Sequence, residues 1–151
     1  MLVQHGTVTI DSDYEVVLEL DTPVSVSESF VLTSCRGEFS TYAYGQATVE
    51  LITVVDGNYT ELRVTRDVIS SSYPCVVEWQ VVTGSEFYVQ HGFSQLSGWT
   101  TSLYPDINQV DLNASFITQT IRSSASNPSN WGCLLTRTTF YNSSSLRLYR
   151  R

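Results

Sequence analysis

The chain of 151 residues contains one tetrapeptide twice, and the spacing between the copies continues along the chain. Val-Gln-His-Gly begins at Val3 and again at Val89, 86 residues later. A match that keeps its register through several blocks indicates a diverged tandem repeat, so we predict two related structural units. Further matches at or near this spacing join Val24 to Val110, Ser29-Phe30 to Ser115-Phe116, Arg36 to Arg122, and 62–66 to 146–150.

Runs of β-branched and aromatic residues alternate with short clusters of Gly, Asn, Asp, Ser and Pro. This pattern is typical of antiparallel β-sandwich or barrel-like folds, and helical periodicity is almost absent. We therefore predict an all-β protein with two repeat-related copies, an acidic unit at 1–86 and a shorter, truncated, arginine-bearing unit at 87–151. The expected strands are 7–10, 15–20, 29–35, 46–55, 59–65 and 76–82 in the first unit, and 114–122, 132–140 and 145–149 in the second.

Several short motifs predict local structure. Asp56-Gly57 between two alternating runs favours a tight β-hairpin. Pro23 has no amide hydrogen and is expected to break the hydrogen-bonding ladder of its strand. The glycine of each repeated tetrapeptide is interpreted as ending a strand at a tight turn, where it supplies unusual dihedral angles. The two histidines, His5 and His91, then fall in separate units, and a shared metal or sugar site is the alternative interpretation of the pair.

The run 76–82 is expected to close the first unit, with Val77, Trp79 and Val81 on one face and polar side chains on the other. The second unit has no equivalent run before the sequence ends at Arg151. Three explanations stay open. The Trp79 strand serves both units, a neighbouring chain donates a strand to the open edge, or the second unit has a smaller sheet.

The formal charge of −7 is distributed unevenly. Residues 1–86 hold thirteen of the fifteen acids against three arginines, whereas 87–151 hold two acids against five arginines. All eight basic residues are arginine, whose planar guanidinium suits protein interfaces. A compositional bias of the genome is one explanation, and the other is a head-to-tail contact between the acidic unit of one subunit and the basic end of the next. The candidate contact residues are Arg137, Arg147, Arg150 and Arg151.

Composition and motifs argue against several classes of function. A pI near 4.6 is unfavourable for binding phosphate, so nucleic acid is not an expected partner. No run is long enough to cross a membrane, and Met1 leads directly into the repeat, so we expect neither a membrane partner nor a signal peptide. Cys35, Cys75 and Cys133 lie in or beside apolar runs and are expected to be buried free thiols. Because no catalytic, phosphate-binding or metal-binding motif stands out, we expect no enzyme activity, no cofactor and no metal.

Aromatic residues in the predicted loops are the best candidates for contact with a ligand. Tyrosine and tryptophan combine a large apolar ring with a polar group, and both are common where proteins bind sugars or other proteins. The alternative is that some of them anchor loops beneath the sheet edge. A carbohydrate site would use Tyr44, Trp99 and Trp131, within the wider set of Tyr42, Tyr44, Tyr88, Trp99, Tyr104 and Trp131.

The segments 3–10, 29–34 with Arg36, 62–66 and 77–82 together resemble a repeat found in virion structural proteins of tailed bacteriophages. That repeat usually carries arginine where this chain has His5 and His91. The resemblance implies an all-β module on the particle surface, such as a capsid decoration or cement subunit or a tail protein. It implies a non-enzymatic homo-oligomer that is made in the host cytoplasm and binds the major capsid protein or other virion proteins. A fainter similarity to H-type lectin sandwiches implies a tail or fibre receptor-binding module that recognises host surface glycans.

Overall fold

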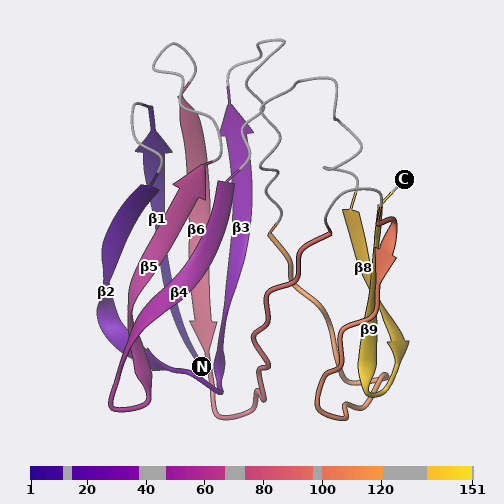
Figure 1. The fold of residues 1–151 in the computed structure, drawn as a ribbon. Helices are drawn as coiled ribbons and strands as arrows, with labels where there is room; N and C mark the ends of the chain where they lie inside the picture. Colours follow the sequence, from indigo (N-terminus) through magenta and orange to yellow (C-terminus); the bar gives the residue numbers. More distant parts are fainter. Residues whose placement is uncertain (12–14, 38–46, 67–73, 97–99, 121–135, 151) are drawn as a thin grey trace. The chain divides into compact units, whose positions relative to one another are not determined.

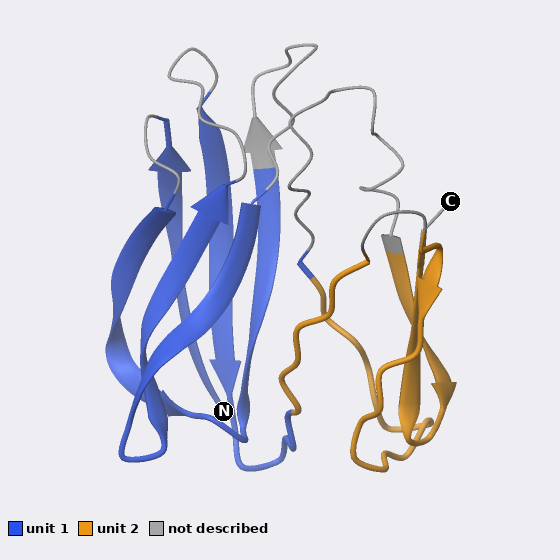
Figure 2. Ribbon diagram, in the orientation of Figure 1, with its two compact units in different colours: residues 1–89, 120–128 blue, residues 90–119, 129–151 orange. Residues whose placement is uncertain are grey.

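The computed structural model describes residues 1–11, 15–37, 47–66, 74–96, 100–120 and 136–150, and the side chains of 36, 37, 136 and 150 lie outside this description. The described residues form nine β-strands and no helix, which confirms the all-β class (Figure 1). The chain divides into two compact units (Figure 2). Unit 1 comprises Met1–Val89 and Thr120–Pro128, and unit 2 comprises Gln90–Gln119 and Ser129–Arg151.

Unit 1 is a sandwich of two antiparallel sheets, which we name sheet A and sheet B (Figure 1). In each sheet a central strand pairs with one strand on either side. Sheet A has the order β1 (Leu2–Ile10), β6 (Cys75–Thr83), β3 (Ser29–Gly37). Sheet B has the order β2 (Glu15–Ser25), β5 (Asn58–Arg66), β4 (Ala47–Val55).

The core of unit 1 lies between the two sheets and is built from alternate positions on each strand. Val77 and Val81 are buried and Trp79 packs against them, while Glu78 and Gln80 are exposed, so the alternation predicted for this strand is confirmed. Each fully buried aliphatic side chain of this kind contributes about 1.5–3 kcal/mol to folding. The buried core residues are Ile10, Leu20, Val24, Ala47, Val49, Leu62, Val64, Cys75, Val77 and Val81.

The hairpin predicted at Asp56-Gly57 is confirmed. Its two turn residues both have positive φ, 49° at Asp56 and 78° at Gly57. This combination is the type I′ turn, whose twist matches the right-handed twist of the flanking strands. The side-chain amide of Asn58 donates to the carbonyl of Asp56 at 3.1 Å, which adds a local bond to the turn. Glycine occupies the position where a side chain would be most strained.

Pro23 interrupts the ladder between β2 and β5, as predicted, but it does not end the strand. The register of this pair shifts between Glu19 and Val24, and β2 continues to Ser25. A bulge of this kind leaves residues without a ladder partner, so the amide hydrogen that proline lacks is not needed there.

The interpretation of Gly6 as a turn residue is wrong. Gly6 lies in the middle of β1 and pairs with Trp79 of β6. Its role is spatial, because a Cβ at this position would lie only 2.6 Å from Cζ2 of the Trp79 indole. The glycine therefore makes room for a large ring within a continuous strand, which is a known reason for glycine inside a sheet.

Unit 2 contains one three-stranded antiparallel sheet of order β7 (Ser102–Leu103), β9 (Ser145–Arg150), β8 (Thr136–Asn142). The strands expected at 145–149 and, within its described part, at 132–140 are present. The strand expected at 114–122 is not found over its described residues 114–120. A strand needs a neighbour to satisfy its amides and carbonyls, and none of the described strands pairs with this segment.

A glutamine side chain joins two segments in each unit through the same pair of hydrogen bonds. In unit 1 the Gln4 amide donates to the carbonyl of Thr22 at 2.7 Å and accepts from the Thr22 amide at 3.0 Å. In unit 2 the Gln90 amide donates to the carbonyl of Asn108 at 3.0 Å and accepts from its amide at 2.6 Å. Gln90 and Asn108 each lie 86 residues after their counterparts in unit 1. The two contacts thus join residues at equivalent positions of the proposed repeat.

Candidate interaction surfaces

The predicted contact arginines that the structure describes lie on the β8–β9 hairpin of unit 2. Arg137 of β8 and Arg147 of β9 both have exposed side chains. Arg150 belongs to β9 by its backbone. The side chain of Arg150 falls outside the described residues, as do Arg151, Tyr44, Trp99 and Trp131.

Tyrosine rings surround the guanidinium of Arg147. The guanidinium carbon lies 4.9 Å from the centroid of the Tyr149 ring and 5.9 Å from that of Tyr104. Tyr104 in turn meets Tyr141 edge-on, with ring centroids 4.9 Å apart. Such cation–π contacts contribute about 0.5–1 kcal/mol at exposed sites. The rings therefore favour this position of the guanidinium over others.

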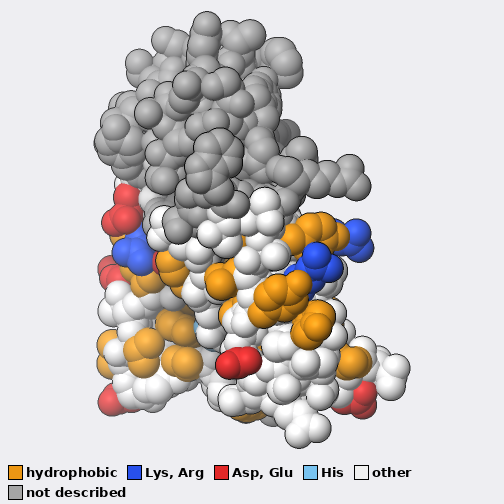
Figure 3. Space-filling model, turned by 45° about the vertical axis from the view of Figure 1, so that its right-hand side comes forward, with side chains coloured by type: hydrophobic (Ala, Val, Ile, Leu, Met, Phe, Trp, Pro, Cys, Tyr) orange, Lys and Arg blue, Asp and Glu red, His pale blue; other side chains and the backbone are white. Residues whose placement is uncertain are grey.

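Strand register places these groups on one face. Arg137 pairs with Tyr149, and Arg147 pairs with Thr139, so alternate residues of both strands share a side of the sheet. We call this face, made of Tyr104, Arg137, Tyr141, Arg147 and Tyr149, the arginine–tyrosine surface. Figure 3 shows basic side chains directly beside hydrophobic ones on the side turned forward.

Arg137 and Arg147 form no salt bridge with any carboxylate among the described residues. The reason lies in the composition, since 87–151 contain only Asp106 and Asp111 as acids. Neither guanidinium charge is thus compensated by a carboxylate of the described residues. Two further tyrosines, Tyr141 and Tyr149, belong to this surface although the sequence reasoning did not select them. Their positions at alternate residues of the hairpin are the signal that would have identified them.

Unit 1 carries the opposite charge on the outer face of sheet B. Glu15, Glu19, Glu50 and Glu61 share this face with Arg63, and we call the five residues the acidic face. Nη2 of Arg63 lies 2.8 Å from Glu50, and its Nε lies 3.8 Å from Glu15. The hydrogen bond to Glu50 raises the pKa of Arg63. Four carboxylates against one guanidinium leave a net charge of −3 on this face.

Two carboxylates of the acidic face lie directly opposite each other. Glu19 of β2 pairs with Glu61 of β5 in the antiparallel ladder. Like charges in such cross-strand positions repel each other and destabilise the pair. A cation from another molecule placed between them would relieve this repulsion. The acidic face therefore carries negative charge that Arg63 does not neutralise.

Arg66 takes no part in the surface charge of unit 1. Its side chain is only 2% exposed, and its guanidinium donates to the carbonyl of Ile10 at 3.2 Å. Among the described side chains of unit 1, one arginine is thus buried and the other is paired with glutamates. The described surface of unit 1 is acidic and that of the unit 2 hairpin is basic, as the charge distribution of the sequence indicates.

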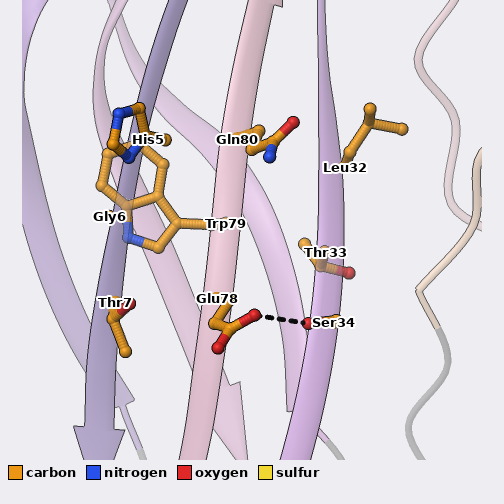
Figure 4. Close-up of a pocket in the computed structure, with 9 residues that line it drawn as sticks. All are labelled: His5, Gly6, Thr7, Leu32, Thr33, Ser34, Glu78, Trp79 and Gln80. Atoms are coloured by element: carbon orange, nitrogen blue, oxygen red, sulfur yellow. Dashed lines mark hydrogen bonds between the residues drawn. The ribbon is translucent and has the colours of Figure 1, made fainter.

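A shallow groove crosses sheet A of unit 1 (Figure 4). The Ser34 hydroxyl donates to Glu78 at 3.2 Å across it, and His5 lies beside Gln80 in the β1–β6 register. Among the described residues, no group of three or more His, Cys, Asp or Glu side chains is placed to hold a metal ion. The lining of the groove is His5, Gly6, Thr7, Leu32, Thr33, Ser34, Glu78, Trp79 and Gln80.

The cysteines follow the prediction in part. Cys75 is a buried free thiol, whereas Cys35 is exposed, which contradicts the expectation for this residue. Cys35 lies near the end of β3, diagonally across the ladder from Cys75. A hydrogen bond from the Cys75 thiol stabilises the Cys35 thiolate and lowers the pKa of Cys35 to about 7. The same bond raises the pKa of Cys75. Cys133 lies outside the described residues.

No helix that could span a lipid bilayer occurs in the described part of the chain. Comparison with protein-family models, with curated proteins and with solved structures finds no match. The case for a function therefore rests on the surfaces of the molecule itself.

Proposed function

We propose that the chain is a non-enzymatic structural subunit of a tailed-phage virion, acting as a capsid decoration or cement protein. In this proposal it associates with further copies and with neighbouring virion proteins, including the major capsid protein. The observation that supports the proposal is the separation of opposite charges onto two surfaces, the arginine–tyrosine surface and the acidic face. The arginine–tyrosine surface has guanidinium groups without acidic partners, and the acidic face has more carboxylates than its one arginine can neutralise.

The two surfaces are complementary in a way that favours head-to-tail assembly. The patch that donates positive charge differs from the patch that receives it, so each copy can bind one neighbour with each patch. Guanidinium groups make flat, bidentate contacts with carboxylates, and exposed tyrosines supply apolar area beside them. Arg150 and Arg151 add two further charges to the same end of the sequence. On a particle, many such modest contacts add up through multivalency.

Charge reversal tests the proposed contact. Arg137→Glu with Arg147→Glu should weaken self-association in sedimentation velocity at low salt, and should lower occupancy on purified particles. Exposed charge pairs contribute about 0.2–1 kcal/mol each, so two of them predict a loss of roughly twofold to thirtyfold in affinity. Association of the unaltered protein should also weaken as salt is raised.

A control variant makes the charge of unit 2 more negative at a different place, by 2 where the double charge reversal lowers it by 4; Arg137→Gln with Arg147→Gln, which also lowers it by 2, is its equal-charge counterpart. Gln109→Glu with Thr118→Glu adds negative charge at exposed residues away from the hairpin strands. This variant should associate more strongly than the arginine variant does. Glu19→Arg with Glu61→Arg on the acidic face should restore association to the charge-reversed hairpin. Unchanged association of the arginine variant at physiological salt would refute the contact.

A second candidate function is glycan recognition by a tail or fibre module. The exposed rings favour it, since Tyr104 is 46% exposed and Tyr141 is 63% exposed. Aromatic rings of this kind can stack on the apolar face of a sugar. Glycan-array binding of purified protein separates the candidates, because a cement subunit should bind capsids and ignore sugars.

A further inference from the structure

We propose that Cys35 and Cys75 form a reversible redox pair, which reacts with a small disulfide such as glutathione disulfide to give a disulfide between the two residues. The pair lies in unit 1 and takes no part in the arginine–tyrosine surface or the acidic face. The proposal therefore does not depend on the function proposed above. Strand register, burial and the contacts of one arginine support it.

Strand register places the two cysteines on the same face of sheet A. Cys35 of β3 pairs with Val77 of β6, and Cys75 pairs with Gly37. Residues two apart in a strand share a face, so Cys35, Cys75 and Val77 point to the same side of the sheet. Val77 is completely buried in the core, which identifies this side as the inner one. The two thiols thus occupy diagonal positions on neighbouring strands.

The two thiols contact each other but differ in exposure. The Cys75 thiol donates a hydrogen bond to the Cys35 sulfur. Cys75 is 0% exposed, whereas Cys35 is exposed. A dissolved disulfide can therefore reach Cys35 first, and Cys75 is the neighbouring thiol that can complete the reaction. Redox-active cysteines commonly combine an accessible thiol with a second, resolving thiol in this way.

A buried guanidinium lies at the same end of the sandwich. Arg66 of β5 is 2% exposed and donates to the carbonyl of Ile10, which is the cross-strand neighbour of Cys75. Arg66 also pairs with Ala47 of β4, whose carbonyl oxygen lies 3.9 Å from the Cys35 sulfur. Figure 1 shows the corresponding ends of β1, β3, β4, β5 and β6 together at one end of unit 1. The two thiols and the guanidinium therefore share one part of the interior between the sheets.

The Arg66 side chain gives this part of the interior a positive charge. Among the described residues, its Nε is buried and has no hydrogen-bond partner. A buried cation costs free energy unless a negative group lies near it. A thiolate at either cysteine is such a group, so the surroundings favour the ionised form that attacks disulfides.

The reaction consists of two thiol–disulfide exchanges. The Cys35 thiolate attacks one sulfur of glutathione disulfide, the S–S bond breaks, and one glutathione leaves as a thiolate. Cys75 then loses its proton to water and attacks the Cys35 sulfur, and the second glutathione leaves. Each departing thiolate takes up a proton from water. The two protein thiols are thereby oxidised by two electrons, and one glutathione disulfide is reduced to two molecules of glutathione.

The first exchange prepares Cys75 for the second. The pKa of Cys75 is raised, first by its hydrogen bond to Cys35 and then by burial and by the charge of Cys35, whereas the charge of Arg66 lowers it. Once Cys35 carries glutathione, its sulfur is neutral, and its charge no longer opposes ionisation of Cys75. The charge of Arg66 remains. We therefore expect the pKa of Cys75 to fall after Cys35 has reacted.

The diagonal position of the pair favours a disulfide that is easily reduced. Diagonal neighbours across an antiparallel ladder have Cα atoms roughly 7–8 Å apart, whereas the Cα atoms of a disulfide are usually no more than about 6.8 Å apart. The strand ends must therefore approach each other by up to about 1 Å, which stores strain in the bond. Strained disulfides are reduced more readily than relaxed ones. The geometry thus suits reversible oxidation.

Peptide mapping of the full chain under nonreducing conditions tests the proposal, because trypsin releases each cysteine in a separate peptide. The peptides are 1–36 with Cys35, 67–122 with Cys75 and 123–137 with Cys133. After incubation with glutathione disulfide, we expect a disulfide between the peptides of Cys35 and Cys75, and an intact mass lower by two hydrogens. Dithiothreitol should restore the original mass.

Variants with one cysteine replaced separate the two exchanges. Cys75→Ala removes the resolving thiol, so Cys35 should react more slowly but keep its glutathione, and the intact mass should rise by one bound glutathione. Cys35→Ala removes the accessible thiol, so Cys75 should carry no glutathione over the same period. Cys133→Ala is the matched control and should give the same Cys35–Cys75 disulfide as the unaltered protein.

Three results would overturn the proposal. The first is that Cys35 of the unaltered protein does not react with glutathione disulfide. The second is a lasting mixed disulfide at Cys35 of the unaltered protein, without a bond to Cys75. The third is a disulfide that joins either residue to Cys133. All three are read from the unaltered protein, so they decide the question even if Cys75→Ala fails a folding check by circular dichroism.

Discussion

Gly6→Ala should destabilise unit 1 through a clash with Trp79. The added Cβ would lie 2.6 Å from Cζ2 and 2.9 Å from Cε2 of the indole. Carbon atoms in favourable contact are about 3.5–4 Å apart, so the ring must move by about 1 Å. Trp79 packs against the buried core of unit 1, so a shift of the ring disturbs its neighbours.

The magnitude follows from two opposing effects. Overpacking a well-filled site costs about 1–3 kcal/mol. Replacing glycine with alanine inside a strand returns about 0.5–1 kcal/mol, because alanine loses less backbone freedom on folding. We therefore expect a net loss of about 1–2 kcal/mol in the free energy of unfolding. This loss is a substantial fraction of the roughly 5–15 kcal/mol that stabilise a typical domain.

Urea denaturation followed by far-UV circular dichroism measures this loss. A double-mutant cycle with Trp79→Leu isolates the clash, because a smaller side chain leaves space for the new methyl group. Gly6→Ala should then cost about 1 kcal/mol less in the Trp79→Leu background than in the unaltered protein. Gly92→Ala is the matched control and should change stability by no more than about 0.5 kcal/mol. An equal cost of Gly6→Ala in both backgrounds would show that the ring contact is not its cause.

Three further outcomes are expected. The rate at which iodoacetamide alkylates Cys35, followed by peptide mass spectrometry, should rise with pH through about 7. The thiolate is the reactive form, and the pKa of Cys35 is lowered to about 7. Cys75→Ala removes the hydrogen-bond donor and should shift the midpoint of this pH dependence upward. Gly57→Ala should lower the free energy of unfolding by about 1–2 kcal/mol in thermal or urea denaturation, because the turn requires a φ of 78° at this position. A loss below about 0.5 kcal/mol, which is typical of surface substitutions, would contradict the strained geometry. Gln4→Ala should lower the free energy of unfolding by about 1–3 kcal/mol, because it leaves two backbone groups of Thr22 without partners. Full stability of this variant in urea denaturation would show that water replaces the Gln4 side chain.

The sequence predicts the strands of unit 1 well because their pattern has a local cause. Alternation along 76–82 reflects one buried face, and Asp56-Gly57 specifies a turn by its own dihedral preferences. The role of Gly6 could not be predicted in the same way, since its reason is a ring 73 residues later in the sequence. The position of β6 in the centre of sheet A, rather than at an edge, likewise depends on pairings between distant segments.

The candidate surfaces were likewise predictable from the sequence only in part. The separation of charge along the chain was visible in the sequence, and it led to Arg137 and Arg147 as candidate contact residues, whose side chains are exposed. The tyrosines beside Arg147 were not predicted, because only strand register and the fold of the chain bring Tyr104 and Tyr149 next to it. Strand register likewise places Glu19 opposite Glu61 and so creates the acidic face.

The central position of β6 also constrains the order in which unit 1 folds. Among the described strands of this unit, β6 is the last to leave the ribosome, yet β1 and β3 pair with no other described strand. The strands of sheet B all lie earlier, within 15–66, so that sheet can form while sheet A still lacks its middle. Nascent unit 1 should therefore pass through a stage in which β1 and β3 have been made but β6 has not. At this stage they expose apolar surface that is prone to mispairing. Pairing between such distant segments is slow, so synthesis of 75–83 should determine when the unit becomes protected from proteases.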